Sequence, residues 1–264
     1  RTVPVCLPHE LLRRHLLLVA KTRRGKSSLL LTLARYLMAA AGPQGHYPAL
    51  VLVDPHRDLA RAALGLVQNL LAHQVDLDLR QALEMAAAGL PIAASPESLD
   101  ACLEFIVERL RNLLLEQGLR YDLVDAVLAE QGAYPARAAR AAKELAGWVT
   151  RPDWNSILPA YARCVRITRD QKERFAVDAG AFVEPAEREL YTALETAEAA
   201  PRQSGSVNDF LNAFLPMIPA VNRFFDDVLV MAEDPRLRSN RLGLLQRIAA
   251  LAHGVADMSR LEGF

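Results

Sequence analysis

The spacing of apolar residues changes near residue 60, and this change predicts two unlike parts. Before it, two short apolar runs at residues 15–20 and 49–53 flank a polar loop and a helical stretch that Gly42-Pro43 ends. That order of strand, loop, helix and strand is typical of a parallel α/β unit. After residue 60 the apolar residues recur at helical spacing and strand signals vanish. We therefore expect a mainly α protein, a helical bundle preceded by a small, incomplete α/β fragment.

Helix-start and helix-stop residues divide the later part into helices with short connections. Ser95-Pro96 and Asp234-Pro235 each supply a capping side chain followed by proline at the first helical position. Gly118 and Gly132 are placed to end helices. The expected helices are residues 95–118, 121–130, 135–147, 148–171, 185–200 and 208–231, and one that starts at Asp234.

Composition agrees with a helical protein, since 52% of the residues are hydrophobic and only 6% are aromatic. The longest apolar runs are too short to span a bilayer and no segment has the pattern of a signal peptide, so we expect a cytoplasmic protein without a membrane partner. The three cysteines and six histidines show no metal-ligand spacing, so no metal site is expected.

Charge is unevenly distributed although its total is zero. Residues 1–60 hold nine Lys/Arg against three Asp/Glu, whereas residues 184–264 hold eight against twelve. Residues 101–183 are close to balance, with twelve basic residues against eleven acidic ones. Nucleic-acid binding by the later part would therefore need local arginine clusters and not a general basic field.

The polar loop between the two apolar runs resembles a Walker-type phosphate-binding loop of the DNA-translocase and conjugation-type ATPases. In such loops a lysine reaches the outer phosphates and a Ser or Thr holds Mg²⁺, and Lys26 and Ser27 stand in those positions. Ala20 replaces the first glycine, however, and Arg23 and Arg24 replace small residues. This part is therefore either a decayed fragment or a weak nucleotide- or anion-binding segment, and we expect no hydrolysis by this chain alone.

The last forty residues have the most informative pattern. Phe224–Asp234, Arg236–Leu245 and Val255–Ser259 closely resemble, in this order, the C-terminus of the bacterial glycyl-tRNA synthetase β subunit. Earlier segments agree with the same family in order, and the resemblance covers about residues 60–264. These earlier segments are residues 61–65, 76–80, 105–111, 116–118, 122–129 and 160–167.

The resemblance implies an all-helical anticodon-binding domain of the type shared with arginyl- and cysteinyl-tRNA synthetases. Together with the change near residue 60, it divides the chain into an α/β P-loop-like fragment (1–60), helices like the tail of the family's HD-like domain (61–98) and the anticodon-binding region (99–264). In the family the α part activates glycine with ATP and Mg²⁺ and the β part holds tRNA(Gly). The implied partners are thus tRNA(Gly) and the α subunit, in an α2β2 assembly or an α–β fusion.

By the same resemblance this chain contains no catalytic residue, and its contribution is to position the tRNA. Two other classes of protein stay open. One is a P-loop NTPase fragment with a helical appendage, and the other is a helical interaction module that binds no RNA.

In the last helix, periodicity separates arginines with different expected roles. At about 100° per residue, Arg236, Asn240 and Arg247 lie on one polar edge, which we expect to be available to RNA. Arg241 instead falls inside the apolar stripe. A buried guanidinium must be paired, so Arg241 is expected to bond Asp226, Asp227 or a loop carbonyl and to hold the fold.

A second basic surface is expected where Arg163, Arg166, Arg169 and Lys172 recur every third residue of one helix. Such a slowly rotating stripe suits a phosphate backbone, although it is also compatible with a solvated face paired to Asp170 and Glu173. Among the aromatic residues, Tyr161 and Phe175 are either base-stacking groups or core, and Trp148 and Trp154 are expected to be packing anchors.

Overall fold

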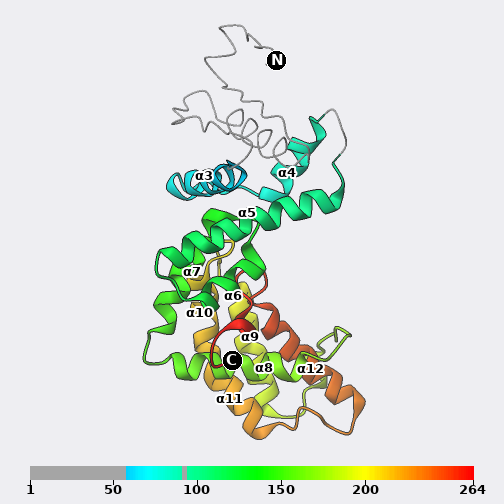
Figure 1. Ribbon diagram of the computed structural model, residues 1–264. Coiled ribbons are helices and arrows are strands. Elements are labelled where there is room, and N and C mark those ends of the chain that lie inside the picture. Colours follow the sequence, from blue (N-terminus) through cyan, green and yellow to red (C-terminus); the bar gives the residue numbers. More distant parts are fainter. Residues whose placement is uncertain (1–57, 91–93) are drawn as a thin grey trace, which may run out of the picture. The chain divides into compact units, whose positions relative to one another are not determined.

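The computed structural model describes residues 58–90 and 94–264, which form helices joined by short connections (Figure 1). No strand occurs among these residues, and the expectation of a mainly α protein is confirmed. The predicted α/β fragment lies outside the described residues, except for residues 58–60 at the start of α3. The helices are α3 (Asp58–Ala72), α4 (Leu79–Ala88), α5 (Pro96–Glu116), α6 (Tyr121–Gln131), α7 (Pro135–Val149), α8 (Trp154–Thr168), α9 (Pro185–Ala199), α10 (Val207–Phe214), α11 (Ile218–Asp227) and α12 (Pro235–Ala250), with 3-10 turns η1 (Ala179–Ala181), η2 (Leu215–Met217) and η3 (Met258–Arg260).

The capping residues identified in the sequence start and end helices as expected. The Ser95 hydroxyl accepts the backbone N–H of Ser98 (3.3 Å) at the start of α5, and the Asp234 carboxylate accepts that of Arg236 (2.7 Å) at the start of α12. Gly132 follows the last residue of α6. Local capping chemistry therefore sets the starts of α5 and α12.

Two expected helices differ from the structure. The stretch 148–171 is not one helix, because α7 continues to Val149, a turn occupies residues 150–153 and α8 ends at Thr168. The stretch 208–231 is divided into α10, η2 and α11 and ends at Asp227. Pro216 and Pro219 lie at the divisions, where proline has no backbone N–H to continue an α-helical ladder.

The chain forms two compact units. Unit 1 comprises the described residues up to Leu113 together with Ala133–Ala136, and unit 2 comprises Leu114–Gly132 and Arg137–Phe264. The predicted domain boundaries at residues 60 and 98 stay predictions.

In unit 1 the Asp78 carboxylate ties the start of α4 to residues 133–136. One oxygen caps α4 by accepting the N–H of Gln81 (3.1 Å), and the other accepts the hydroxyl proton of Tyr134 (2.7 Å). The backbone N–H of Leu79 also donates to the Ala133 carbonyl (2.9 Å). This unit buries a core of aliphatic side chains that includes Leu79, Leu83, Ile106 and Leu110.

The core of unit 2 centres on an aromatic cluster from α8 and α10. The Tyr161 ring packs edge-on against Phe210 and Phe214, at 5.6 Å between centroids in each case. Its hydroxyl donates to the Ala249 carbonyl on α12 (2.7 Å), so its one polar atom is satisfied inside the core. Tyr161 is 3% exposed, and the core alternative for this residue is confirmed.

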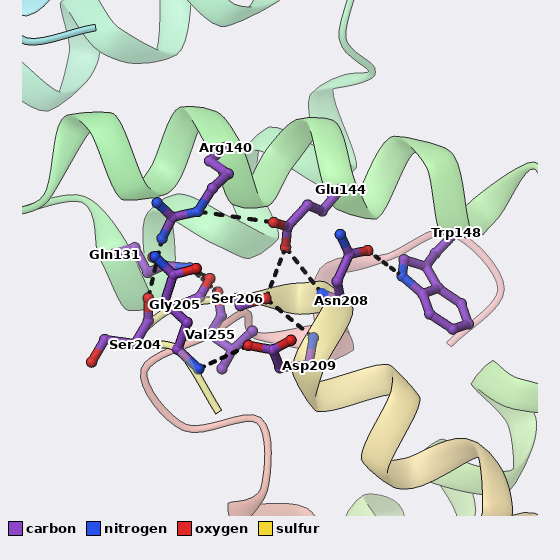
Figure 2. A network of polar contacts seen from close by, with 11 residues as sticks. Gln131, Arg140, Glu144, Trp148, Ser204, Gly205, Ser206, Asn208, Asp209 and Val255 are labelled. Carbon is purple, nitrogen blue, oxygen red and sulfur yellow. Dashed lines mark hydrogen bonds and ion pairs between the residues drawn. The ribbon is translucent and has the colours of Figure 1, made fainter. Parts of the chain in front are cut away.

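One face of α7 holds the loop before α10 and the first turn of α10 (Figure 2). Glu144 accepts the backbone N–H of Asn208 (3.0 Å), and the Trp148 indole donates to the Asn208 side chain (2.8 Å). One turn earlier, Arg140 donates to the Ser204 carbonyl (3.3 Å). These three α7 residues are spaced four apart, so they share one face of the helix and act together on the loop. Trp148 is 5% exposed, as expected of a packing anchor.

Gly205 in the same loop is required by its surroundings (Figure 2). Its φ of +71° is a left-handed conformation, and a Cβ here would lie 2.1 Å from the Gln131 side-chain oxygen. The Gln131 amide nitrogen donates to the carbonyls of Gly205 (3.0 Å) and Val255 (2.6 Å). Gln131 thus joins α6 to two segments that lie 74 and 124 residues further along the chain.

Residues 257–262 are also bound to α6. Asp122, which is 1% exposed, accepts the backbone N–H of Glu262 (3.0 Å) and a hydrogen bond from Arg120 (2.7 Å). Burial alone would raise the pKa of Asp122, but these hydrogen bonds lower it below its ordinary value. The Asp257 N–H adds a bond to the Ala126 carbonyl (2.8 Å).

A buried ion pair joins α9 to α12. Glu187 and Arg241 are 1% and 6% exposed, and the guanidinium Nε lies 2.7 Å from the carboxylate Oε1. The other carboxylate oxygen accepts the N–H groups of Val183 (2.8 Å) and Glu184 (2.7 Å), and Arg241 also donates to the Leu229 carbonyl (2.8 Å). The pair therefore fixes the start of α9 and the segment after α11 as well as the two helices.

This arrangement confirms the structural role expected of Arg241 and its bond to a loop carbonyl. The expected acidic partners, Asp226 and Asp227, were wrong, because both are exposed and the carboxylate that reaches Arg241 comes from α9.

We expect Arg241→Met to destabilise unit 2 by roughly 3 kcal/mol or more, because it leaves the Glu187 carboxylate buried and unpaired. The measurement is the free energy of unfolding in urea. The matched control is Arg223→Met, since Arg223 is exposed and pairs with Glu189 (2.6 Å) and Asp227 (3.3 Å). That loss should stay below about 1 kcal/mol. Equal losses of unfolding free energy in the two variants would show that the buried Glu187–Arg241 pair contributes no more to stability than an exposed pair does.

The same pair predicts a pH dependence. Burial alone would raise the pKa of Glu187, but the hydrogen bonds from Arg241, Glu184 and Val183 lower it below its ordinary value. A carboxyl with a depressed pKa contributes stability above its unfolded pKa of about 4.3, and the contribution is lost as pH falls through the folded pKa. Acid titrations of unfolding should show a weaker pH dependence below about pH 4 in Glu187→Gln than in the wild type, and superimposable curves would contradict this assignment.

Candidate nucleic-acid interface

The polar edge of α12 that was expected to face RNA is covered by the chain itself. Asn240 is 4% exposed, and its amide accepts the backbone N–H of Asp178 (2.7 Å) and donates to the Asp178 carbonyl (3.0 Å). Both ends of the side chain are therefore used inside the protein. The RNA-facing role expected of Asn240 is corrected, because periodicity identified the edge but not the segment that packs on it.

Two more α12 residues, Gly243 and Gln246, contact the same segment, which comprises residues 173–178. Gln246 accepts the N–H of Phe175 (3.0 Å) and donates to the Glu173 carbonyl (2.7 Å). Between Asn240 and Gln246, Gly243 lets the segment approach so closely that a Cβ would lie 2.7 Å from the Phe175 carbonyl oxygen. Polar residues three positions either side of a helical glycine were the sequence signal for this contact.

Arg247 and Arg236 lie in different surroundings, although both were placed on the same edge. Arg247 makes two hydrogen bonds to the Glu198 carboxylate and lies 5.3 Å from the centre of the Tyr191 ring. The Glu198 hydrogen bond raises the pKa of Arg247, and the carboxylate largely neutralises its charge. Arg236 is exposed, and its side chain makes no ion pair within the part of the chain that the structure describes.

The predicted basic stripe is only partly on a helix. Since α8 ends at Thr168, Arg169 is its capping residue and Lys172 lies in the following loop. Arg163 is half-buried with its guanidinium over the Phe225 ring, and Arg166 is exposed with its guanidinium near the Phe264 ring.

We name Arg166, Arg169, Lys172 and Arg174 the basic end of α8. All four are exposed, and none makes a salt bridge within residues 58–90 and 94–264. Asp170 and Glu173 lie among them in sequence, but neither forms an ion pair in the described chain, so the alternative of a self-paired charged face does not hold there. Cations without a carboxylate partner are available to an external anion.

The backbone that follows α8 is fixed by contacts with α12. Residues 173–178 are bound to α12 through Gln246, Gly243 and Asn240. Arg174 lies inside this bound segment, and Lys172 directly precedes it. A charged group on a fixed backbone loses less conformational freedom when it binds a ligand.

Other chemistry finds no support in the described residues. No group of three or more His, Cys, Asp or Glu there is arranged to hold a metal ion. Burial raises the pKa of the Cys164 thiol to about 12, which keeps it protonated at neutral pH. None of the described helices is long and apolar enough to cross a membrane. The phosphate-loop candidates, Lys26 and Ser27, lie outside the described residues.

Two family models match the chain in sequence. The model described as glycyl-tRNA synthetase beta subunit matches residues 53–129, and the model described as DALR anticodon binding domain matches residues 157–256. The second match contains α8 from Ile157 onward, α9 to α12 and the whole basic end of α8.

Curated relatives agree with these matches. The chain is 40% identical over 217 residues to the glycine–tRNA ligase beta subunit of Aromatoleum aromaticum, covering 77% of this chain and 30% of the relative. For the beta subunit of Anaeromyxobacter dehalogenans strain 2CP-C the identity is 37% over 213 residues, with the same shares. A glycine–tRNA ligase of Arabidopsis thaliana, chloroplastic/mitochondrial, is 34% identical over 208 residues, 78% of this chain and 20% of the relative. The chain thus spans less than a third of the length of these relatives.

We expect Gly243→Ala to displace residues 173–178 from α12, because the added Cβ meets a backbone oxygen that cannot rotate away. The loss of stability should be about 1–3 kcal/mol. The matched control is Gly147→Ala on α7, where the added Cβ meets open space. Because alanine has the higher helix propensity, this variant should be more stable than the wild type by about 0.5 kcal/mol. Urea unfolding measures both variants, and amide hydrogen exchange should speed up at residues 173–178 in Gly243→Ala only. Unchanged exchange there would contradict the packing described.

Proposed function

Because this chain belongs to the glycyl-tRNA synthetase β-subunit family, matching its C-terminal region, we propose that unit 2 binds the anticodon arm of tRNA(Gly). The observation that carries the proposal is the basic end of α8, a group of exposed cations without carboxylate partners inside the segment that matches an anticodon-binding domain. Anticodons are read as single-stranded loops, whose phosphates such cations can contact.

The charge balance of the protein supports a local contact. The total charge is zero, so no general field draws the RNA to the chain, and affinity must come from a few phosphate contacts at one place. Arg166, Arg169 and Lys172 lie at and just beyond the end of one helix, where three cations can follow a phosphate backbone. Arg236, which is also exposed and unpaired in the described chain, is a separate cation of the same proposal.

In this proposal the chain performs no aminoacylation chemistry. ATP and Mg²⁺ act in the complete synthetase at an active site that the α subunit provides, and that subunit is the proposed protein partner. The binding energy of the anticodon arm is used to orient the acceptor end of the tRNA toward that site. The proposed location is the compartment in which the chain meets tRNA(Gly), the cytoplasm in a bacterium.

We expect the 264-residue chain to bind a tRNA(Gly) transcript more tightly than an unrelated tRNA or duplex DNA, with affinity that falls as salt rises. Replacing Arg169, Lys172 and Arg174 together by glutamine should lower the slope of log K against log salt by about 2, since each lost contact to single-stranded phosphate removes roughly 0.7. Fluorescence anisotropy at several salt concentrations measures both.

The control for this experiment is Arg223→Gln together with Arg260→Gln, two exposed arginines that already pair with carboxylates. These should leave the slope unchanged. Equal affinity of the wild type for all three nucleic acids would exclude the proposed function, and an equal loss of slope in both sets of variants would exclude the basic end of α8 as its site.

A further inference from the structure

The arginines at positions 109, 151, 163, 166 and 247 lie over aromatic rings, and they fall into two groups. Arg109, Arg151 and Arg247 each also form a salt bridge with a carboxylate. Arg163 and Arg166 have no carboxylate partner in residues 58–90 and 94–264. A guanidinium that lies over a ring and also meets a carboxylate is largely satisfied, so Arg163 and Arg166 are better placed than the first group to bind an external partner.

The Arg163 stack is the better defined of the two. Its guanidinium carbon lies 4.3 Å from the centre of the Phe225 ring, whereas that of Arg166 lies 5.5 Å from the centre of Phe264. One nitrogen of Arg163 also lies 3.5 Å from the Asn222 side-chain oxygen. The ring and the amide together restrain the plane of the guanidinium.

The ring beneath Arg163 is itself anchored in the core of unit 2. Phe225 meets Phe224 edge-on at 5.6 Å, and Phe224 is fully buried. Phe225 and Arg163 are half-buried, and Asn222 is exposed. The chain therefore presents a layered group, with the Phe225 ring below and the Arg163 guanidinium above, and the ring contacts a buried core residue.

We propose that the outer face of the Arg163 guanidinium is a platform on which an unpaired base of the bound tRNA stacks, with Asn222 at its edge to hydrogen-bond that base. This inference rests on the proposed function and names the part of the RNA that this place binds. Stacking on arginine planes and aromatic rings is a common way for proteins to hold splayed-out RNA bases.

A base fits Arg163 better than a phosphate does. One nitrogen of the guanidinium is directed to Asn222, which uses an in-plane donor that a bidentate phosphate contact would need, while Phe225 covers one face and leaves the other for stacking. The open face offers area and positive charge, which suit the π face of a base. Arg166 follows about one turn later on α8 and Arg169 is the capping residue of that helix, and both can hold the phosphates beside that base.

The test compares Arg163→Lys and Phe225→Leu with the wild type, using the anticodon stem-loop of tRNA(Gly) as the probe. Lysine keeps the charge and removes the flat stacking surface, so affinity should fall roughly 5- to 100-fold while the salt slope stays unchanged. Phe225→Leu should weaken binding similarly by removing the support beneath the guanidinium. The matched control is Arg151→Lys, which alters a guanidinium stacked on Trp148 but paired with Asp153, and it should change affinity less than twofold.

Stem-loops with one abasic loop position at a time identify the base. In the wild type, one abasic position should weaken binding by a similar factor, and in Arg163→Lys that position should cost nothing further. A wild type that does not prefer tRNA(Gly) overturns the proposed function. A wild type that does prefer it, with unchanged affinity in Arg163→Lys or abasic losses equal in both proteins, overturns the platform alone. Thermal unfolding of each variant separates a loss of fold from a loss of binding, and Arg163→Lys, on the surface, keeps the test valid if Phe225→Leu unfolds.

Discussion

The buried pair of Glu187 and Arg241 is the constraint on which the arrangement of unit 2 depends. A carboxylate and a guanidinium with almost no exposure are tolerated only if every remaining donor and acceptor is satisfied. Here the carboxylate serves two backbone N–H groups at the start of α9, and the guanidinium serves a carbonyl after α11. Moving any one of these segments would leave a buried charge or a buried hydrogen-bonding group without its partner, so the pair favours one arrangement of three segments.

With α9 and α12 set in this way, the other faces of α12 become a scaffold for the loop after α8. Asn240, Gly243 and Gln246 hold residues 173–178, and the cations of that loop acquire defined positions. The path from core to surface is short. A single ion pair orients a helix, the helix fixes a loop, and the loop carries the charge that an RNA would meet.

Local signals in the sequence predicted much of this fold, because capping and proline chemistry act within one turn. Ser95-Pro96 and Asp234-Pro235 set helix starts, and the periodicity of the last helix placed Arg241 in its apolar stripe. The carboxylate that meets Arg241 could not be predicted, since Glu187 lies 54 residues away and its approach depends on how α9 packs. The breaks at Pro216 and Pro219 had a local cause, which the run of apolar residues obscured.

The surroundings of the candidate site residues were predicted less well, and for a related reason. Periodicity says which residues share a face, but not whether another segment covers that face. Asn240 is covered, Arg247 is paired with Glu198, and Tyr161 lies in the core. The half-buried Phe225 on α11 instead supports Arg163 of α8, a contact between two helices that periodicity does not predict. The exposure of cations at the end of a helix, such as Arg169, is easier to predict, because a helix end leaves its last side chains with few neighbours.

The bonds that join α6 to residues 255–262 bear on how unit 2 is made during synthesis. Gln131 and Asp122 are buried polar groups near the start of this unit, and their partners follow more than 120 residues later. A ribosome adds some 5–20 residues per second, so these polar groups stay solvated for several seconds or more before their hydrogen-bond partners have been synthesised. Such distant pairings also slow the search for the native topology. Unit 2 should therefore close in one late step, with α6 docked only once the final segment has left the exit tunnel.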